Sequence, residues 1–161
     1  MINPPQVRDL IVYPTLDLMA LHKTLDQREA AMQLLMGTAM QESGCGDDIA
    51  QLGGGPALGI WQMEPPTFDL VVSWTRANRA DLYAKLGLHC GPLSSDSLPG
   101  DLYLGCWTAR LLYYSVPEAL PAKDDAVAQA AYYKQYYNSP KGAATIAEFT
   151  ANWHKAMSLL A

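Results

Sequence analysis

Residues 38–67, TAMQESGCGDDIAQLGGGPALGIWQMEPPT, join the end of an apolar run to a glycine-rich segment and a double proline. Upstream, Thr24 followed three residues later by Gln27 is typical of a capping box, which predicts a helix over about residues 24–43. Six glycines in residues 44–60 favour tight turns or a short hairpin. Prolines suit the first turn of a following helix. The stretch therefore predicts a helix, a loop and a second helix.

The composition favours a single compact domain over residues 1–161, because half of the 161 residues are hydrophobic and no linker-like stretch divides them. A net charge of -5 argues against a general nucleic-acid binder. Three cysteines without a CxxC make a disulfide scaffold improbable. We see no secretory signal and no apolar stretch long enough to cross a bilayer, so membrane insertion is not expected.

Helical patterns fill most of the remaining chain, and strand signals are weak. The first pattern covers about residues 5–22, where Pro14 is expected to break or kink the helix. Thr145 and Glu148 form a second capping box, which predicts a helix to the C-terminus. Further helices are predicted over residues 67–77, 80–87, 101–115 and 125–138. The fold class is therefore all-α, or α-rich α+β.

Glu42 lies on the apolar face of the helix predicted over residues 24–43. A helical wheel brings side chains three and four residues apart to one side. The apolar stripe that results consists of Ala31, Leu34, Leu35, Thr38 and Ala39. Glu42 continues this stripe, whereas Gln33 and Gln41 are expected to point elsewhere. The carboxyl group at this helix end is therefore predicted to face the core side.

Two effects would raise the pKa of a carboxyl group in this position. Burial disfavours the ionised form, and the negative end of the helix dipole disfavours it further. A carboxylic acid that stays protonated near neutral pH suits general acid catalysis. The structural alternative is that Glu42 accepts hydrogen bonds from backbone amides and locks the turn. The position alone leaves both interpretations open.

The segment GIWQMEPPT at 59–67 carries groups that suit a sugar substrate. Gly59 permits close backbone approach, Trp61 offers a stacking surface, and Gln62 both donates and accepts hydrogen bonds. Trp61 and Met63 could equally be core residues. His89 and Cys90 could be a pair of metal ligands, but no second pair at zinc-like spacing exists, so no metal is expected.

These motifs resemble the soluble lytic transglycosylases of the lysozyme-like superfamily. In that pattern Glu-Ser is followed by Gly-Leu-Met-Gln and then Pro-x-Thr. Here ESG begins at Glu42, and GIWQMEPPT follows a glycine-rich loop. The phage-encoded branch often has GGGPA before this motif, as this chain has at 53–57. The late YYNSPKG segment resembles the family's Ala-Tyr-Asn-Ala-Gly.

The resemblance implies a lysozyme-like domain with the glycine-rich loop, or a short hairpin, beside an active-site cleft. It implies Glu42 as the catalytic residue, with no cofactor. The substrate-binding residues that it implies are Ser43, Gly59, Trp61, Gln62, Thr67, Tyr137 and Asn138. Tyr133 and Tyr136 are alternatives for the late tyrosine.

The resemblance also implies cleavage of the β-1,4 bond between N-acetylmuramic acid and N-acetylglucosamine in a peptidoglycan glycan strand. A transglycosylase needs Glu42 alone and forms a 1,6-anhydro product. A hydrolytic muramidase needs a second carboxylate. The candidates for that second carboxylate are Glu64, Asp47 and Asp48. The family pattern favours the transglycosylase.

We expect a phage protein that is carried in the virion, contacts other virion proteins and acts on the cell wall while the genome enters the host. An endolysin is an alternative. A second alternative, from a different class, is a virion structural protein that keeps the fold with little turnover.

Overall fold

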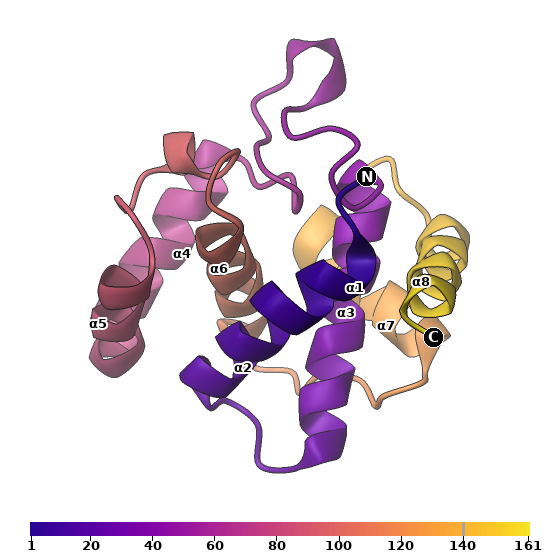
Figure 1. The fold of residues 1–161 in the computed structure, drawn as a ribbon, viewed down its shortest axis with the longest axis horizontal. Helices are drawn as coiled ribbons and strands as arrows, with labels where there is room; N and C mark the ends of the chain where they lie inside the picture. The colour runs from indigo at the N-terminus through magenta and orange to yellow at the C-terminus, as the bar shows by residue number, and fades with distance from the viewer. Residues whose placement is uncertain (140) are drawn as a thin grey trace.

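The computed structural model describes residues 1–139 and 141–161, and helices joined by loops form its framework (Figure 1). Among these residues no sheet forms, and isolated antiparallel bridges join only Ala50 to Leu58 and Leu58 to Met63. The predicted all-α class is confirmed, without the α+β alternative. The elements are α1 (Pro4–Val7), η1 (Arg8–Val12), α2 (Tyr13–Met19), α3 (Leu25–Ser43), η2 (Leu52–Gly54), α4 (Pro65–Asn78), α5 (Ala80–His89), η3 (Ser95–Ser97), α6 (Leu102–Tyr114), α7 (Ala126–Tyr133), η4 (Lys134–Asn138) and α8 (Ile146–Leu160).

Helix α3 runs through the middle of the molecule, with other helices on several sides of it (Figure 1). Every residue from Ala30 to Met40 is buried, so the helix is covered all round and not along one stripe. Gln33, which the helical wheel placed away from the core, is only 8% exposed. Its amide nitrogen donates to Asp124 Oδ1 at 2.8 Å. The predicted stripe was therefore too narrow, because polar residues with partners also fit inside.

The N-terminal helices pass through Pro14 without ending there. Residues 8–12 form the π-helical turn η1, in which the N–H of Tyr13 donates to the carbonyl oxygen of Arg8, five residues earlier. Proline removes an N–H and crowds the carbonyl four residues before it. The wider π turn just ahead of Pro14 accommodates both effects. Of the expected break or kink, the break was therefore wrong, since helical geometry continues to Met19, and the π turn is the local distortion at this point.

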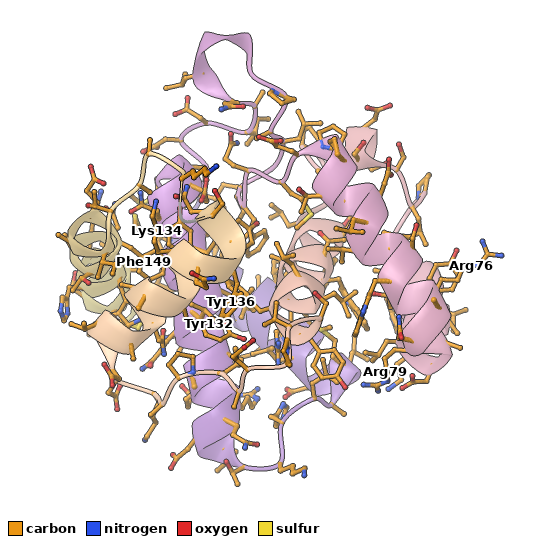
Figure 2. The ribbon with its side chains drawn as sticks, turned by 180° about the vertical axis from the view of Figure 1, so that it is seen from behind. Arg76, Arg79, Tyr132, Lys134, Tyr136 and Phe149 are labelled. Carbon is orange, nitrogen blue, oxygen red and sulfur yellow. The ribbon has the colours of Figure 1, made fainter. Side chains whose placement is uncertain are left out.

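Helix α8 lies along α3, and α7 packs against α8. Gly37 makes the approach of α3 and α8 possible, because a Cβ there would lie 2.9 Å from Trp153 Cδ1 and 3.1 Å from Phe149 Cζ. Figure 2 labels Phe149 beside α7, where its ring stacks on that of Tyr133 at 4.3 Å. The capping box predicted at Thr145 is confirmed at the start of α8.

The glycine-rich loop between α3 and α4 extends beyond the helices at its tip and returns to the core at both ends (Figure 1). Gly44 ends α3 in the left-handed conformation, with φ of 60°. The buried side chains that anchor the loop are Cys45, Ala57, Ile60, Trp61 and Met63. Around the tip, residues 51–54 are exposed. The loop ends are therefore fixed next to the C-terminal end of α3.

The close approach of α3 and α8 gives a stability test. We expect Gly37→Val to lower the free energy of unfolding by about 2 kcal/mol, because the added methyl groups overlap Trp153 and Phe149. Gly87→Ala is the matched control, since Gly87 lies in helix α5 with open space around it. That change should raise the free energy of unfolding by about 1 kcal/mol. Urea titration measures both, and a Gly37→Val variant as stable as wild type would contradict the packing.

Candidate active site

Glu42 occupies the last turn of α3, one residue before the helix ends. Its side chain is partly buried between the helix end and η4. The hydroxyl group of Tyr133, the last residue of α7, donates a hydrogen bond to Glu42 Oε1 at 2.6 Å. The carboxyl group is thus held by a side chain that lies 91 residues further along the chain.

The pKa of Glu42 is raised from 4.5 to about 7. Burial is the largest cause, because it disfavours the ionised form, and the hydrogen bond from Tyr133 offsets part of this effect. The group is therefore close to half protonated at neutral pH. A carboxyl group in this state both donates and accepts a proton readily, which suits general acid–base catalysis.

Three tyrosines surround this carboxyl group, and each has a raised pKa. Burial is the main cause for Tyr113, Tyr133 and Tyr137, and the charge of Glu42 adds to it. Their hydroxyl groups therefore stay protonated and available as donors. Tyr137 donates to the carbonyl oxygen of Trp61 at 2.7 Å and stacks beside Tyr133. The hydroxyl groups of Tyr113 and Thr38 lie 2.7 Å apart.

A cavity of about 460 Å³ opens next to Glu42. It is bounded by the end of α3, the glycine-rich loop, the start of α4 and η4. The residues that line it are Glu42, Gln51, Ala57, Gln62, Met63, Glu64, Thr67, Leu112, Tyr137, Asn138 and Ser139. The fold thus brings together Glu42 and five of the residues singled out in the sequence: Gln62, Glu64, Thr67, Tyr137 and Asn138.

Two polar side chains at the cavity wall, Gln62 and Asn138, are held by hydrogen bonds within the protein. The amide nitrogen of Gln62 donates to the carbonyl oxygens of Gly59 and Asp48, at 2.8 and 3.3 Å. Asn138 lies in the π-helical turn η4 and accepts a hydrogen bond from Lys134 at 3.0 Å. π-Helical turns recur at functional sites. These contacts fix the positions of Gln62 and Asn138 at the cavity wall.

Three residues that the resemblance assigned to substrate binding have structural positions instead. Ser43 is buried and donates to the carbonyl oxygen of Ile60 at 2.6 Å, which ties the helix end to the loop. Gly59 has φ of 74°, and a Cβ there would lie 2.9 Å from Leu98 O. Trp61 is only 1% exposed, so the expected stacking surface was wrong. Its indole N–H donates to the carbonyl oxygen of α3 residue Leu35 at 3.0 Å.

The candidates for a second carboxylate separate in space. Asp47 forms an ion pair with the amino group of Met1 and lies outside the cavity lining. The side chain of Asp48 also lies outside that lining. Glu64, an exposed residue at the start of α4, does line the cavity with Glu42. Of the three, Glu64 is therefore the one that lines the same cavity as Glu42.

The sequence had left the late tyrosine open among three positions, and the structure assigns different places to them. Tyr133 contacts Glu42, Tyr137 lines the cavity, and Tyr136, labelled in Figure 2 with Tyr132, packs edge-on against Tyr132 at 4.7 Å. Gln51 in the loop is a lining residue that no sequence pattern indicated. Its position depends on the path of the loop, which local sequence does not specify.

Cys45, Cys90 and Cys106 are all free thiols. Within residues 1–139 and 141–161, no three histidine, cysteine, aspartate or glutamate side chains gather as metal ligands would. None of the helices in the described residues has the length and apolar character needed to cross a membrane. No protein-family model, curated protein or solved structure matches this chain.

The raised pKa of Glu42 makes stability depend on pH. Since the folded-state pKa of about 7 exceeds the unfolded value of 4.5, stability is lost as the pH rises through this interval. Glu42→Gln removes this titration. The free energy of unfolding of the variant should therefore rise relative to that of wild type between about pH 4.5 and 8. At about 1.36 kcal/mol per pKa unit, the gain in the free energy of unfolding is roughly 3 kcal/mol. Urea titrations at several pH values measure it.

Glu148→Gln is the control for this experiment, because the pKa of Glu148 is lowered by the hydroxyl group of Thr145. Its contribution to stability is present above the unfolded pKa and is lost in acid. The control variant should therefore lose stability relative to wild type as the pH rises, which is the opposite direction. A Glu42→Gln variant whose difference from wild type stays constant with pH would show that Glu42 is not protonated by burial.

Proposed function

We propose that this chain cleaves glycosidic bonds in peptidoglycan, with Glu42 as the proton donor. The observation that carries the proposal is a carboxyl group with a pKa of about 7, held by Tyr133 at the wall of a polar cavity. The resemblance of the ESG and GIWQMEPPT segments to lytic transglycosylases supplies the substrate class, the β-1,4 bond between N-acetylmuramic acid and N-acetylglucosamine.

In the proposed lyase reaction, the protonated Glu42 carboxyl donates its proton to the glycosidic oxygen as that oxygen leaves C1 of the muramic residue. The resulting carboxylate then accepts the proton of the muramic C6 hydroxyl group, and the C6 oxygen bonds to C1. The product is a 1,6-anhydro sugar, and Glu42 returns to its protonated form without water. A pKa near 7 suits one group for both transfers.

The surrounding residues have roles that follow from their positions. The Tyr133 hydroxyl group, 2.6 Å from Oε1, stabilises the carboxylate that forms after the first transfer. Gln62, Thr67 and Asn138 line the cavity with groups that hydrogen-bond sugar hydroxyls and acetamido groups. No cofactor or metal takes part in this scheme.

A hydrolytic muramidase is the second candidate, and the position of Glu64 favours it. This carboxyl group lines the same cavity as Glu42. In a hydrolase, Glu64 would act as base or nucleophile, and a water molecule would become part of the product. The two reactions therefore differ in the sugar end that they leave.

We further propose that a phage particle carries the protein to the cell wall, where it acts while the genome enters the host. A net charge of -5 supports delivery by a larger assembly, because an acidic protein is not attracted to an anionic cell surface. Other virion proteins would then be its partners.

Mass analysis of muropeptides released from purified peptidoglycan tests the reaction. We expect 1,6-anhydromuramic ends from wild type, and reducing ends if Glu64 directs hydrolysis. Glu42→Gln should lower the rate at least about 100-fold, because the Gln amide is not acidic enough to protonate the leaving oxygen. Glu148→Gln, at the start of α8 and outside the cavity lining, is the control and should keep full activity. If folded wild-type protein releases no fragments, the proposed enzymatic activity is contradicted and the virion structural protein is favoured.

The pH dependence of kcat/KM tests the role of Tyr133. Since general acid catalysis needs protonated Glu42, activity should fall above a midpoint of about 7. Tyr133→Phe removes a hydrogen bond that lowers the pKa of Glu42, so the midpoint should move to higher pH. Tyr136→Phe is the control, because Tyr136 packs against Tyr132 instead. Identical midpoints in all three proteins would show that Tyr133 does not lower the pKa of Glu42.

A further inference from the structure

A second cavity, of about 480 Å³, lies at the opposite end of α3 from Glu42. There the connection between α2 and α3 comes close to the connection between α6 and α7 (Figure 1). We call it the α3 N-terminal pocket. It is lined by residues 21–23, by Asp26, Gln27 and Ala30 of α3, by Arg110 of α6, and by residues 119–123.

Arg110 is the unusual group in this pocket. It is only 5% exposed, and its Nε and Nη1 atoms are enclosed without a hydrogen-bond partner. Among the described residues, it also has no ion-pair partner. By contrast, Arg28 pairs with Asp17 at 2.7 Å and Arg79 with Asp81 at 2.7 Å. A guanidinium group that is buried without a partner is costly, and such groups in proteins are normally paired.

The guanidinium group stays charged in spite of its burial. Burial lowers the pKa of Arg110 to about 10, which still leaves it protonated at neutral pH. The ring of Tyr114, whose centroid lies 5.8 Å from Arg110 Cζ, offsets part of the desolvation through a cation–π contact. The N–H groups at Nε and Nη1 have no hydrogen-bond partner in the described residues.

The rest of the lining reinforces a positive charge and adds apolar surface. Lys23 and Lys123 also line the pocket, and Asp26 is the one acidic residue among the lining residues. Asp26 pairs with Lys123 at 3.1 Å, so it does not neutralise Arg110. Leu21 and Leu120 supply apolar walls. In a chain with a net charge of -5, this pocket is a local excess of positive charge.

We propose that the α3 N-terminal pocket binds a small organic acid, whose carboxylate accepts hydrogen bonds from the unpartnered guanidinium group of Arg110. The planar, positively charged guanidinium group complements the planar, negatively charged carboxylate. The apolar residues of the pocket contact the hydrocarbon part of the ligand. Inorganic phosphate satisfies the same N–H groups but leaves the apolar walls uncovered. This inference stands apart from the glycosidase proposal, because the pocket shares no lining residue with the Glu42 cavity.

Titration of the wild-type chain with benzoate, benzamide and inorganic phosphate, followed by NMR, tests the site. We expect benzoate to shift the Arg110 Nε–H resonance and the amides that line the pocket, with a dissociation constant of about 1 mM. Benzamide has the same shape without the charge, so it should bind at least about tenfold more weakly. The amides around Glu42 should not move.

Arg110→Met is the decisive variant, because it keeps the volume of the side chain and removes the charge. It should fold with unchanged or higher stability, since replacing a buried unpaired charge is often stabilising, and it should lose benzoate binding at least about tenfold. Arg76→Met, on the exposed side of α4 (Figure 2), is the control and should bind as wild type does.

Three outcomes would overturn the proposal: equal affinity for benzoate and benzamide, unchanged benzoate binding by Arg110→Met, or phosphate binding more tightly than benzoate. If Arg110→Met does not fold, the Arg110 Nε–H shift in the wild-type titration decides by itself. None of these results bears on whether Glu42 cleaves a glycosidic bond.

Discussion

A carboxyl group held at the C-terminal end of a fully enclosed helix is the constraint around which this molecule is arranged. Burial and the negative end of the helix dipole both disfavour the charge of Glu42, and the hydroxyl group of Tyr133 compensates only in part. Helix α3 is covered by several helices, and α8 covers one side of it by packing closely over Gly37. The same packing of α7 and α8 sets Tyr133 in place through its stacking on Phe149.

Much of the framework could be predicted from local sequence signals. The capping residues Thr24 and Thr145 mark two helix starts where the structure has them, because a side-chain cap acts within a few residues. The order of helix, glycine-rich loop and helix around residues 38–67 follows from the same kind of signal. The spacing of Glu42 to the apolar residues of α3 also indicated that its carboxyl group faces inward.

The parts that sequence did not indicate depend on contacts between distant segments. The burial of Gln33 requires Asp124 as a partner, and a helical wheel contains no such information. Trp61 suits a stacking surface by its chemistry, yet it fills the core because Gly105 of α6 leaves room for its ring. Arg110 lies among mostly apolar residues of α6, and no local sequence pattern indicates that its guanidinium group is buried without a partner.

The titration of the Glu42 carboxyl carbon by ¹³C NMR measures the protonation of this group in the folded protein, on which proton donation depends. The Glu42→Gln variant identifies the resonance by its disappearance. The expected midpoint is a pKa of about 7 in the folded protein. A midpoint near the ordinary value of about 4.5 would mean that Glu42 is ionised at neutral pH, and it would contradict a role as proton donor.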